Sequence, residues 1–377
     1  MPMTRLADEL ALESRVPGAR PAYRFATADG VRSKRSFRAA ELLLVESLWD
    51  AEPGRLLVPA ANYGVVGVVL ADRAPGVHLA ESSARAARLC ERNARRNDAD
   101  VDVSIVADLT ALDGGFETVA YAPKPYTPLA VGTQRIADAL AVLEPGGELS
   151  LAASPRTGLG RYETRLDEMA ASVERRATRE DCRLLVATRP ESFDPPTAVS
   201  PRTIRPEIGD TSLRLVTVPG LFSPTSLDDG TRLLLETATV EDGECVLDLC
   251  CGYGAIGVYA GLSADCEVWL SDDDRVATAC AECSLEASGV DATVVTADCT
   301  AGVADRTFDR VLCNPPTHAG DGVLAELFAG IADVLARGGE LTTVHHRDLD
   351  LREYLSRFDR VETRRTGAEH VVLSATG

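Results

Sequence analysis

The sequence repeats itself after about 190 residues. Gly64 and Gly254 occupy matching glycine turns 190 residues apart, and Gly146 and Gly338 begin matching Gly-Gly-Glu-Leu segments 192 residues apart. Other segments pair in the same order: VHLAESSARAARLC with VWLSDDDRVATAC, SIVADLT with VVTADCT, and FETVAYAPKP with FDRVLCNPPT. A near-constant separation through several elements indicates a tandem duplication. We therefore expect two copies of one domain.

Each copy alternates strand-like and helix-like segments. RLLVPAANYGVVGVVLA, for example, begins as an apolar strand, passes through a turn and continues as a helix. This alternation is typical of a parallel α/β sheet. The predicted fold is two tandem doubly wound, Rossmann-like domains, at residues 1–190 and 207–377, with residues 1–50 a helical and strand-like preamble. Residues 191–206 are rich in Pro, Ser and Thr and are predicted to be the linker.

The chain is strongly acidic, with a net charge of −19 and only two lysines, Lys34 and Lys124, among its 39 basic residues. Such a composition resembles that of proteins from salt-accumulating halophiles, in which high salt screens self-repulsion. Taken alone, the charge argues against a nucleic-acid partner. Two basic clusters are nevertheless candidate phosphate contacts; they are Arg32, Lys34, Arg35 and Arg38, and Arg92, Arg95 and Arg96.

No apolar run reaches membrane-spanning length, and the first residues lack the apolar core of a signal peptide. The protein is therefore expected to be cytoplasmic, without a membrane partner. Its ten cysteines are expected to stay reduced. Cys280 and Cys283 form the only Cys-x-x-Cys pair, with no second pair at zinc spacing, so no metal site is predicted.

The two copies differ at the positions where chemistry is expected. The second copy has Asp248 at the end of its first strand, Gly252 in the turn and Asn314-Pro315-Pro316 after its fourth strand. The first copy has Pro59, Asn62 and Ala122-Pro123-Lys124 instead, although Glu81, Gly64 and Asp108 are retained. We therefore predict a non-catalytic first domain and an active second domain.

The Asn-Pro-Pro segment ends the predicted strand Phe308–Cys313. Pro315 and Pro316 lack a backbone N–H and have a fixed φ, so neither can continue a sheet ladder. At such a rigid bend the Asn314 amide and the Pro315 carbonyl can both accept hydrogen bonds from one planar NH2 group. The alternative is that the segment is only a strand-ending turn.

The glycine turn of the second copy has the spacing D-x-x-x-G-x-G. Glycine lets the backbone approach a ligand closely, and Asp272 after the next strand is placed to accept hydrogen bonds from a ribose. A carboxylate at Asp248 would repel a pyrophosphate but suits a cationic amino acid ligand. Two alternatives remain: Gly257 permits a loose dinucleotide fingerprint of an NAD-type oxidoreductase, and Asp248 could simply cap the following helix.

The second domain resembles class I S-adenosylmethionine-dependent methyltransferases. The whole chain resembles the two-domain ribosomal RNA guanine-N2 methyltransferases of the small- and large-subunit type. The segments that carry the resemblance are LFSPTSLDDGTRLLL, VLDLCCGYGAIG, NPPTHAG and HRDLDLREYL, with APKPYTP and RTGLGRYETRL in the degenerate first half. The resemblance implies that only the second domain binds S-adenosylmethionine.

The resemblance also implies roles for individual residues. The methionine end of the cofactor would contact Asp248, Cys250, Gly252 and Gly254, its ribose would contact Asp272, and its adenine edge would contact Asp298 and Cys299. A lid over the site would be formed by Phe222, Ser223, Asp228 and Gly230. The target amine would be held by Asn314, Pro315 and Pro316. Two residues depart from the family pattern. Cys250 replaces the first glycine of the turn, and Thr317 replaces an apolar or aromatic residue, which leaves His318 as a second candidate for packing on the base.

The implied activity is direct methyl transfer to an exocyclic amine of RNA, guanine N2 in ribosomal RNA. The implied partner is ribosomal RNA or a ribosomal subunit, and the two domains could pair within a monomer. Adenine N6 and a protein glutamine amide are alternative acceptors, since related enzymes also use Asn-Pro-Pro, usually followed by an aromatic residue. A non-catalytic RNA-binding assembly factor is a third alternative that suits the first domain.

Overall fold

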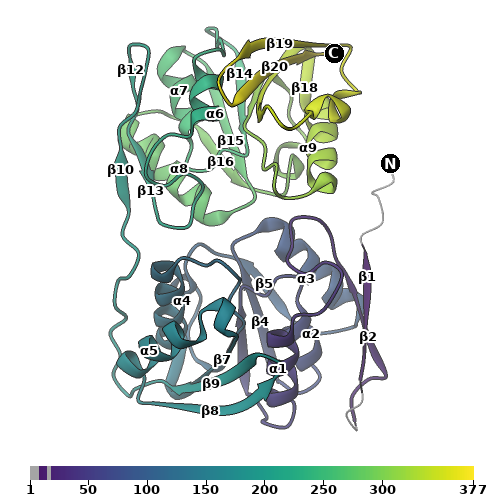
Figure 1. The fold of residues 1–377 in the computed structure, drawn as a ribbon, viewed down its shortest axis with the longest axis vertical. Helices are drawn as coiled ribbons and strands as arrows, with labels where there is room; N and C mark the ends of the chain where they lie inside the picture. Colours follow the sequence, from purple (N-terminus) through teal and green to yellow (C-terminus); the bar gives the residue numbers. More distant parts are fainter. Residues whose placement is uncertain (1–7, 15–17) are drawn as a thin grey trace. The chain divides into compact units, whose positions relative to one another are not determined.

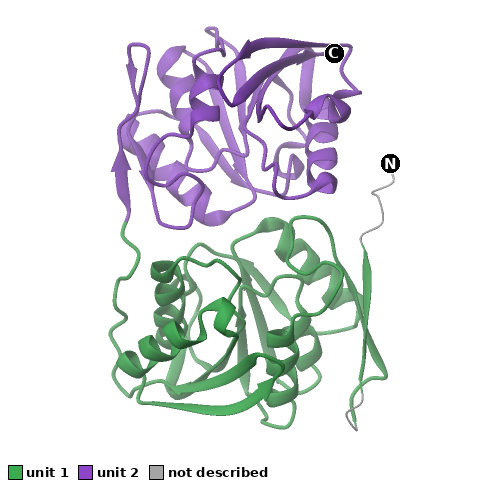
Figure 2. Ribbon diagram, in the orientation of Figure 1, with its two compact units in different colours: residues 1–200 green, residues 201–377 purple. Residues whose placement is uncertain are grey.

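The computed structural model describes residues 8–14 and 18–377. The chain divides into two compact units, Met1–Ser200 and Pro201–Gly377 (Figures 1 and 2). The division lies inside the segment 191–206 that we expected to be the linker. The middle of that segment is bonded to the first unit, because the backbone N–H groups of Ala198 and Val199 donate to Gln134 Oε1 at 2.7 and 3.1 Å. The end of it forms strand β10 (Arg202–Ile204) of the second unit.

The second unit is built on one seven-stranded sheet with the order β16-β15-β14-β17-β18-β20-β19. The first five strands in that order run parallel, and β20 pairs antiparallel with both β18 and β19. The strands are β14 (Cys245–Leu249), β15 (Glu267–Asp272), β16 (Thr293–Thr296), β17 (Phe308–Cys313), β18 (Leu335–His346), β19 (Arg360–Thr366) and β20 (His370–Thr376). The helices are α6 (Asp229–Leu235), α7 (Ala255–Ser263), α8 (Arg275–Ser288) and α9 (Asp321–Val334), with 3-10 turns η3 (Ala301–Val303) and η4 (Leu351–Leu355).

Helices cover both faces of this sheet because successive strand residues point to opposite faces. Val246 of β14 packs with α6, α7 and α8 on one face, whereas its neighbour Leu247 packs with α9 on the other. Three short strands precede the sheet: β11 (Glu207–Ile208), β12 (Thr211–Ser212) and β13 (Leu215–Thr217), the last paired with β10. Both sheet faces are therefore buried, as expected for parallel strands.

The first unit has the same topology, with the strand order β5-β4-β3-β6-β7-β9-β8. The strands are β3 (Arg55–Pro59), β4 (Gly76–Glu81), β5 (Asp102–Ile105), β6 (Phe116–Tyr121), β7 (Leu143–Ala153), β8 (Ser172–Arg179) and β9 (Cys182–Thr188). The helices are α1 (Ala39–Leu48), α2 (Val65–Leu70), α3 (Ala84–Arg96), α4 (Leu129–Val142) and α5 (Leu159–Met169), with 3-10 turns η1 (Leu109–Ala111) and η2 (Pro155–Thr157). The predicted tandem duplication of a doubly wound domain is thus confirmed.

Residues ahead of this sheet form a hairpin and a helix, in line with the expected preamble. β1 (Glu9–Glu13) and β2 (Ala22–Ala26) pair antiparallel, and helix α1 follows. Helix α1 begins 190 residues before α6, so it is the first-copy counterpart of α6. No helix among residues 8–14 and 18–377 is long and apolar enough to span a membrane.

The strand register corrects one sequence-based match. Val58 pairs with Leu79 of the neighbouring strand, just as Asp248 pairs with Leu270 in the second unit. Val58, and not Pro59, therefore stands at the position of Asp248. The first copy has replaced the strand-end carboxylate by an apolar side chain that is 4% exposed.

Candidate active site

The predicted site residues converge at the carboxyl edge of the second sheet. The chain runs from β14 to one side through β15 and β16, and then crosses back to place β17 on the other side of β14. Ligands of open α/β sheets bind at such a switch point. Leu249 is the register partner of Cys313, so the glycine turn after β14 and the Asn314 segment after β17 leave the sheet side by side.

The turn between β14 and α7 holds three residues in the left-handed region: Cys250 at φ 63°, Gly252 at φ 55° and Gly254 at φ 84°. A Cβ on Gly254 would lie 3.1 Å from Ala281 Cβ and Leu270 Cδ2, so this glycine allows close packing. Apart from its two chain neighbours, no heavy atom of residues 8–14 and 18–377 would lie within 4 Å of a Cβ on Gly252. Gly252 therefore faces open space, where a ligand can approach the backbone.

Asp272 fixes the same turn from the end of β15. Its carboxylate oxygens accept the backbone N–H groups of Gly252 and Asp274, each at 2.9 Å. Burial is the main cause that raises the pKa of Asp272 to about 6, against the opposing effect of these two hydrogen bonds. Asp272 is thus a hydrogen-bond acceptor that is itself bonded to the backbone of Gly252.

Asp248 is fully buried at the end of β14. Its Oδ2 accepts the Gly257 backbone N–H of α7 at 2.8 Å, whereas its Oδ1 has no hydrogen-bond partner among the described residues. Desolvation raises the pKa of Asp248 to about 8. One oxygen therefore serves the helix, as the capping alternative requires. The other is a buried acceptor that suits a cationic group.

Asp298 and Cys299 follow β16 at the same edge. Asp298 is 6% exposed, and Cys299 has a left-handed backbone with φ 51°. A carboxylate oxygen of Asp298, the Cys299 Sγ and a carboxylate oxygen of Glu326 in α9 lie within 4.8 Å of one another. This is the one cluster of three such potential metal-ligand atoms in the part of the chain that the structure describes. Three such groups have the chemistry to hold hydrogen-bond donors at the rim of the site.

Asn314 lies at the end of β17 with its side-chain amide held by two residues of the α6 region. Its Nδ2 donates to Asp228 Oδ2 at 3.2 Å and to Thr231 Oγ1 at 2.9 Å. The Pro315 carbonyl already accepts the Thr317 backbone N–H at 2.9 Å, which leaves it one lone pair. Pro316 and His318 are exposed, and Pro315 is buried.

The predicted lid segment lies before and within the start of α6. Phe222 is 68% exposed, and Ser223 has a left-handed backbone with φ 44°. The Tyr253 hydroxyl donates to the carbonyls of Ser223 and Ser226 at 3.3 and 3.4 Å, so the lid is bonded to the glycine turn. Asp228 belongs to the start of α6, where it caps the helix by accepting the Thr231 backbone N–H at 2.8 Å.

Sequence reasoning missed three residues of this arrangement: Thr231, Tyr253 and His370. Thr231 lies inside the segment LDDGTRLLL, which was matched for its aspartate and glycine. A Cβ on Gly230 would lie 2.9 Å from His370 Cδ2 and 3.0 Å from Asp228 Oδ2, so the histidine ring and the carboxylate both lie close to this glycine. The motif contained the signal for Thr231, whereas His370 comes from β20 and no local pattern points to it.

The equivalent region of the first unit is filled by its own side chains. Glu81, at the position of Asp272, is 1% exposed; it accepts the Asn62 backbone N–H at 2.5 Å and pairs with Lys124 at 3.4 Å. The Asn62 amide bonds both the backbone N–H and the carbonyl of Arg32 at 3.0 Å, so it occupies the space that Gly252 leaves open. The groups at the positions of Asp272 and Gly252 therefore already have partners within the first unit.

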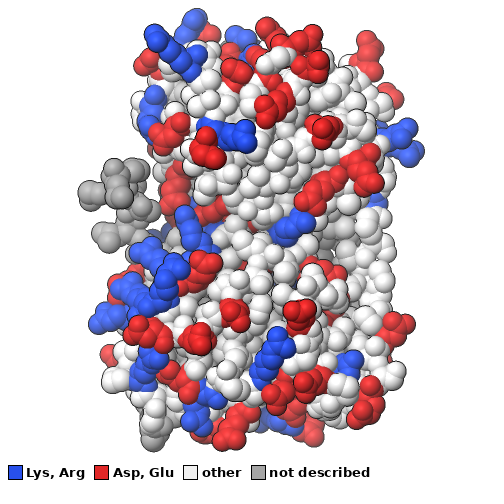
Figure 3. Space-filling model, turned by 180° about the vertical axis from the view of Figure 1, so that it is seen from behind, with Lys and Arg blue, Asp and Glu red and all other residues white. Residues whose placement is uncertain are grey.

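The structure also corrects the first basic cluster. The Arg38 side chain is 9% exposed; it pairs with Glu41 at 3.3 Å and donates to the carbonyls of Ala122 and Pro123. Lys34 pairs with Asp29. Only Arg32 and Arg35 of this cluster are exposed, together with Arg92, Arg95 and Arg96 of α3. Figure 3 shows basic side chains gathered in one region of the first unit, while acidic ones are spread over the rest of that face.

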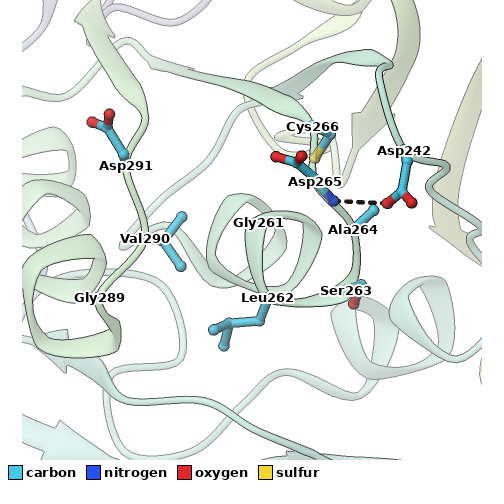
Figure 4. A pocket seen from close by; sticks show the side chains of 10 residues that line it. All are labelled: Asp242, Gly261, Leu262, Ser263, Ala264, Asp265, Cys266, Gly289, Val290 and Asp291. Atoms are coloured by element: carbon cyan, nitrogen blue, oxygen red, sulfur yellow. Dashed lines mark hydrogen bonds between the residues drawn. The ribbon is translucent and has the colours of Figure 1, made fainter.

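One cavity of the second unit lies away from these residues. It has a volume of about 570 Å³ and is lined by the end of α7, by the segment between α7 and β15, and by residues after α8. Figure 4 shows Asp291 on one side and Asp242 on the other, where Asp242 accepts the Asp265 backbone N–H at 2.9 Å. These residues lie at the amino edge of the parallel strands, opposite the switch point, so the cavity is not part of the candidate site.

Comparison with known proteins identifies both halves of the chain. The methyltransferase small domain model matches it twice, over residues 22–185 and 212–374. Ribosomal RNA large subunit methyltransferase G of Pseudomonas putida (strain GB-1) is 30% identical over 359 residues, which cover 90% of this chain and 93% of that protein. Ribosomal RNA small subunit methyltransferase C of Pseudoalteromonas atlantica is 31% identical over 215 residues, which cover 55% of this chain and 60% of that protein.

A solved structure has the same fold over both units. It is the T. thermophilus 16S rRNA N2 G1207 methyltransferase in complex with AdoMet and guanosine, with a TM-score of 0.79 and 23% identity, covering 97% of this chain and 98% of that chain.

The fold, the switch-point site and the family match define a class, the S-adenosylmethionine-dependent methyltransferases. Within that class, the chain belongs to the methyltransferase small domain family. It is a two-domain member related to the ribosomal RNA methyltransferases of small-subunit type C and large-subunit type G.

Proposed function

We propose that the second domain binds S-adenosylmethionine and transfers its methyl group to guanine N2 of ribosomal RNA. The observation that carries this proposal is the position of Asn314, which leaves the sheet beside the glycine turn. An amine held at Asn314 would therefore lie next to a ligand held at the turn.

The residues around the turn fit a cationic nucleoside ligand. The buried Asp248 Oδ1 offers an acceptor for an ammonium group, and Gly252 leaves its backbone approachable. Asp272 would bind the ribose hydroxyls, with Asp298 and Cys299 at the adenine edge and Phe222 and Ser223 above. S-adenosylmethionine supplies a methyl group that is already activated by a positively charged sulfur, so the protein needs little acid–base chemistry.

The task of Asn314 and Pro315 is to hold and orient the acceptor amine. The lone pair of guanine N2 is delocalised into the ring, and two hydrogen-bond acceptors on its N–H groups favour a more pyramidal, nucleophilic nitrogen. Asn314 Oδ1 and the remaining lone pair of the Pro315 carbonyl are those acceptors. Preorganised groups of this kind lower the barrier by orientation and electrostatics. The base must leave its stack to reach them.

Guanine in ribosomal RNA is favoured over the other acceptors by the relatives. The similarity to the large subunit methyltransferase G extends through both domains, and not only through the Asn-Pro-Pro segment. Thr317 departs both from the aromatic residue usual in adenine-N6 and glutamine-amide methyltransferases and from the apolar or aromatic residue usual in the guanine-N2 family, so this position does not distinguish the acceptors. The duplicated first domain, with its ligand-facing groups already paired, is proposed to be a scaffold that contacts RNA.

The test is nucleoside analysis of ribosomal RNA by mass spectrometry in a deletion strain. We expect the loss of one N2-methylguanosine, restored by the wild-type gene and not by an Asn314→Ala variant. An unchanged N2-methylguanosine content with the loss of N6-methyladenosine would show that adenine N6, and not guanine N2, is the acceptor. No change in any ribosomal RNA nucleoside would overturn it.

A further inference from the structure

We propose that Asp228 and Thr231 are positioning residues, which turn the Asn314 side-chain amide so that its oxygen faces the target amine. This inference rests on the proposed function, because it concerns the same acceptor. It assigns to Asp228 a role different from the lid contact that the family resemblance implies, and it adds Thr231 to the machinery of the site.

The hydrogen bonds around Asn314 allow only one orientation of its amide. Asp228 Oδ2 accepts the Thr231 backbone N–H at 2.8 Å and the Thr231 hydroxyl at 3.3 Å. An ionised carboxylate is acceptor-only, so the group of Asn314 that lies 3.2 Å from it must be the NH2. The Thr231 hydroxyl donates its one hydrogen bond to Asp228, so its oxygen meets the same NH2 as an acceptor at 2.9 Å.

A reversed amide would be unfavourable at both contacts. Asn314 Oδ1 would then face a carboxylate oxygen, and the NH2 group would face the target amine, where donor would meet donor. Asp228 and Thr231 thus place both of the amide's protons away from the substrate. The acceptor that remains, Oδ1, is the one that an exocyclic NH2 requires.

Gly230 makes room for this arrangement. A Cβ at this position would approach Asp228 Oδ2 to 3.0 Å and the His370 ring to 2.9 Å. Any side chain here would push against the carboxylate that holds Asn314. The three residues of the Asp-x-Gly-Thr segment at the start of α6 therefore act together: Asp228 caps the helix, Gly230 leaves space for the carboxylate, and Thr231 supplies the hydroxyl.

The first unit offers an internal comparison, because all three positions differ there together. Arg38 stands at the position of Asp228, Glu41 at that of Thr231 and Ala122 at that of Asn314. Without an asparagine to orient, the Arg38 guanidinium donates to the Ala122 carbonyl at 3.3 Å and also to the Pro123 carbonyl. Asp228 in the second copy and Arg38 in the first therefore occupy equivalent positions, and each bonds the residue at the position of Asn314. This is expected if Asp228 and Thr231 orient Asn314.

The test compares two substitutions that both retain the helix cap. Asn and Ser cap helices about as well as Asp. Asp228→Asn can keep an oxygen where Asp228 Oδ2 lies, whereas the shorter Asp228→Ser withdraws it from Asn314. We expect kcat to fall roughly tenfold or more in Asp228→Ser, as for loss of a preorganising contact, and much less in Asp228→Asn. Thr231→Val should add to the loss in Asp228→Ser, while the cofactor Kd stays unchanged.

The decisive measurement is made in an Asn314→Ala background, with tritiated S-adenosylmethionine and ribosomal RNA or subunits from the deletion strain. If Asp228 acts through Asn314, then Asp228→Ser causes no further loss of kcat there. An equal fractional loss in both backgrounds, or full activity of the Asp228→Ser/Thr231→Val variant, overturns the inference. Unaltered turnover in Asn314→Ala, or no transfer by the wild type, overturns the proposed function instead.

Discussion

Asp248 and Asp272 are acids in surroundings that favour their neutral forms. Burial is the largest cause that raises their pKa values to about 8 and about 6. Between about pH 4 and those values, the folded domain holds protons that the unfolded chain has released. The stability of the empty domain therefore falls as the pH rises through this window. A cationic ligand has the opposite preference, because it binds the ionised carboxylates.

We expect the affinity for S-adenosylmethionine to rise from pH 6 to pH 8. Binding near neutral pH must displace a proton from Asp248, and the free-energy cost of this displacement becomes smaller as the pH approaches the pKa of about 8. Calorimetry across this range in two buffers of different ionisation enthalpy measures both affinity and proton release. In Asp248→Asn the rise should flatten; a wild-type affinity that is independent of pH would contradict the role of Asp248.

Asn314→Ala should reduce kcat by about a hundredfold or more, as expected when a preorganised acceptor is removed. The cofactor Kd should change little, because the amide contacts Asp228 and Thr231 and not the glycine turn. Single-turnover kinetics at saturating substrate, with Kd measured separately, tests this. Near-normal turnover would show that Asn314 only shapes the turn after β17 and does not hold the target amine.

At the scale of the element, the glycine turn retains its backbone conformation while its residues change. Ala60, Asn62 and Gly64 have φ values of 52°, 64° and 90°, close to those of the second copy's turn. Asparagine tolerates the left-handed region better than most residues. The first copy could therefore replace the open glycine by Asn62 without refolding the turn, and its amide then closed the space by bonding Arg32.

Placing the first copy's asparagine at position 252 of the second copy should abolish cofactor binding without affecting the stability of the fold. We expect Gly252→Asn to fold with a Tm near that of the wild type, because the backbone conformation suits asparagine, and to lose cofactor binding, because the side chain enters the ligand's space. Thermal unfolding with and without S-adenosylmethionine measures both. The matched control is Asn62→Gly in the first domain, which should leave binding unaltered; cofactor-induced stabilisation of Gly252→Asn would contradict this account of the turn.

Most of the elements followed from local pattern and from the repeat. β17 begins and ends where the sequence predicts it, since two prolines terminate an apolar strand. The match of Pro59 to Asp248 was one position off the 190-residue spacing of the repeat, and the pairing of Val58 with Leu79 shows that the strict spacing holds in the strand. Arg38 was assigned to the surface because nothing local shows that its counter-charge, Glu41, is itself buried. The bond from Asn314 to Asp228 joins residues 86 apart, beyond the reach of any local pattern.

For the whole molecule, the duplication predicts one cofactor per chain. In the second unit Asp248 has an unpartnered oxygen, whereas in the first unit Val58 replaces it and Lys124 already pairs with Glu81. Calorimetry of the full chain should give a stoichiometry of one, and Asp272→Ala should weaken that single site. Two sites, or binding that survives Asp272→Ala unchanged, would contradict this prediction.

Under the proposed function, we expect the exposed arginines Arg32 and Arg35 to contact RNA. We expect Arg32→Ala with Arg35→Ala to raise the Michaelis constant for RNA severalfold and to leave cofactor binding unaltered. Molar potassium chloride is the stringent condition, because counterion release weakens phosphate contacts as salt rises, and arginine forks retain geometric specificity. The matched control is Arg175→Ala with Arg176→Ala on strand β8. Equal effects of the two pairs would remove Arg32 and Arg35 from the RNA path.

Two sheets of identical strand order in one chain present a hazard during synthesis. Strands of one copy resemble those of the other, and exchange between similar neighbours is a common misfolding route of repeated domains. The order along the chain counters it. The last strand of the first sheet ends at Thr188, and the first strand of the second sheet begins only at Cys245. A ribosome therefore delivers every strand of the first sheet before any competing strand exists, so the time order of translation favours pairing within each copy.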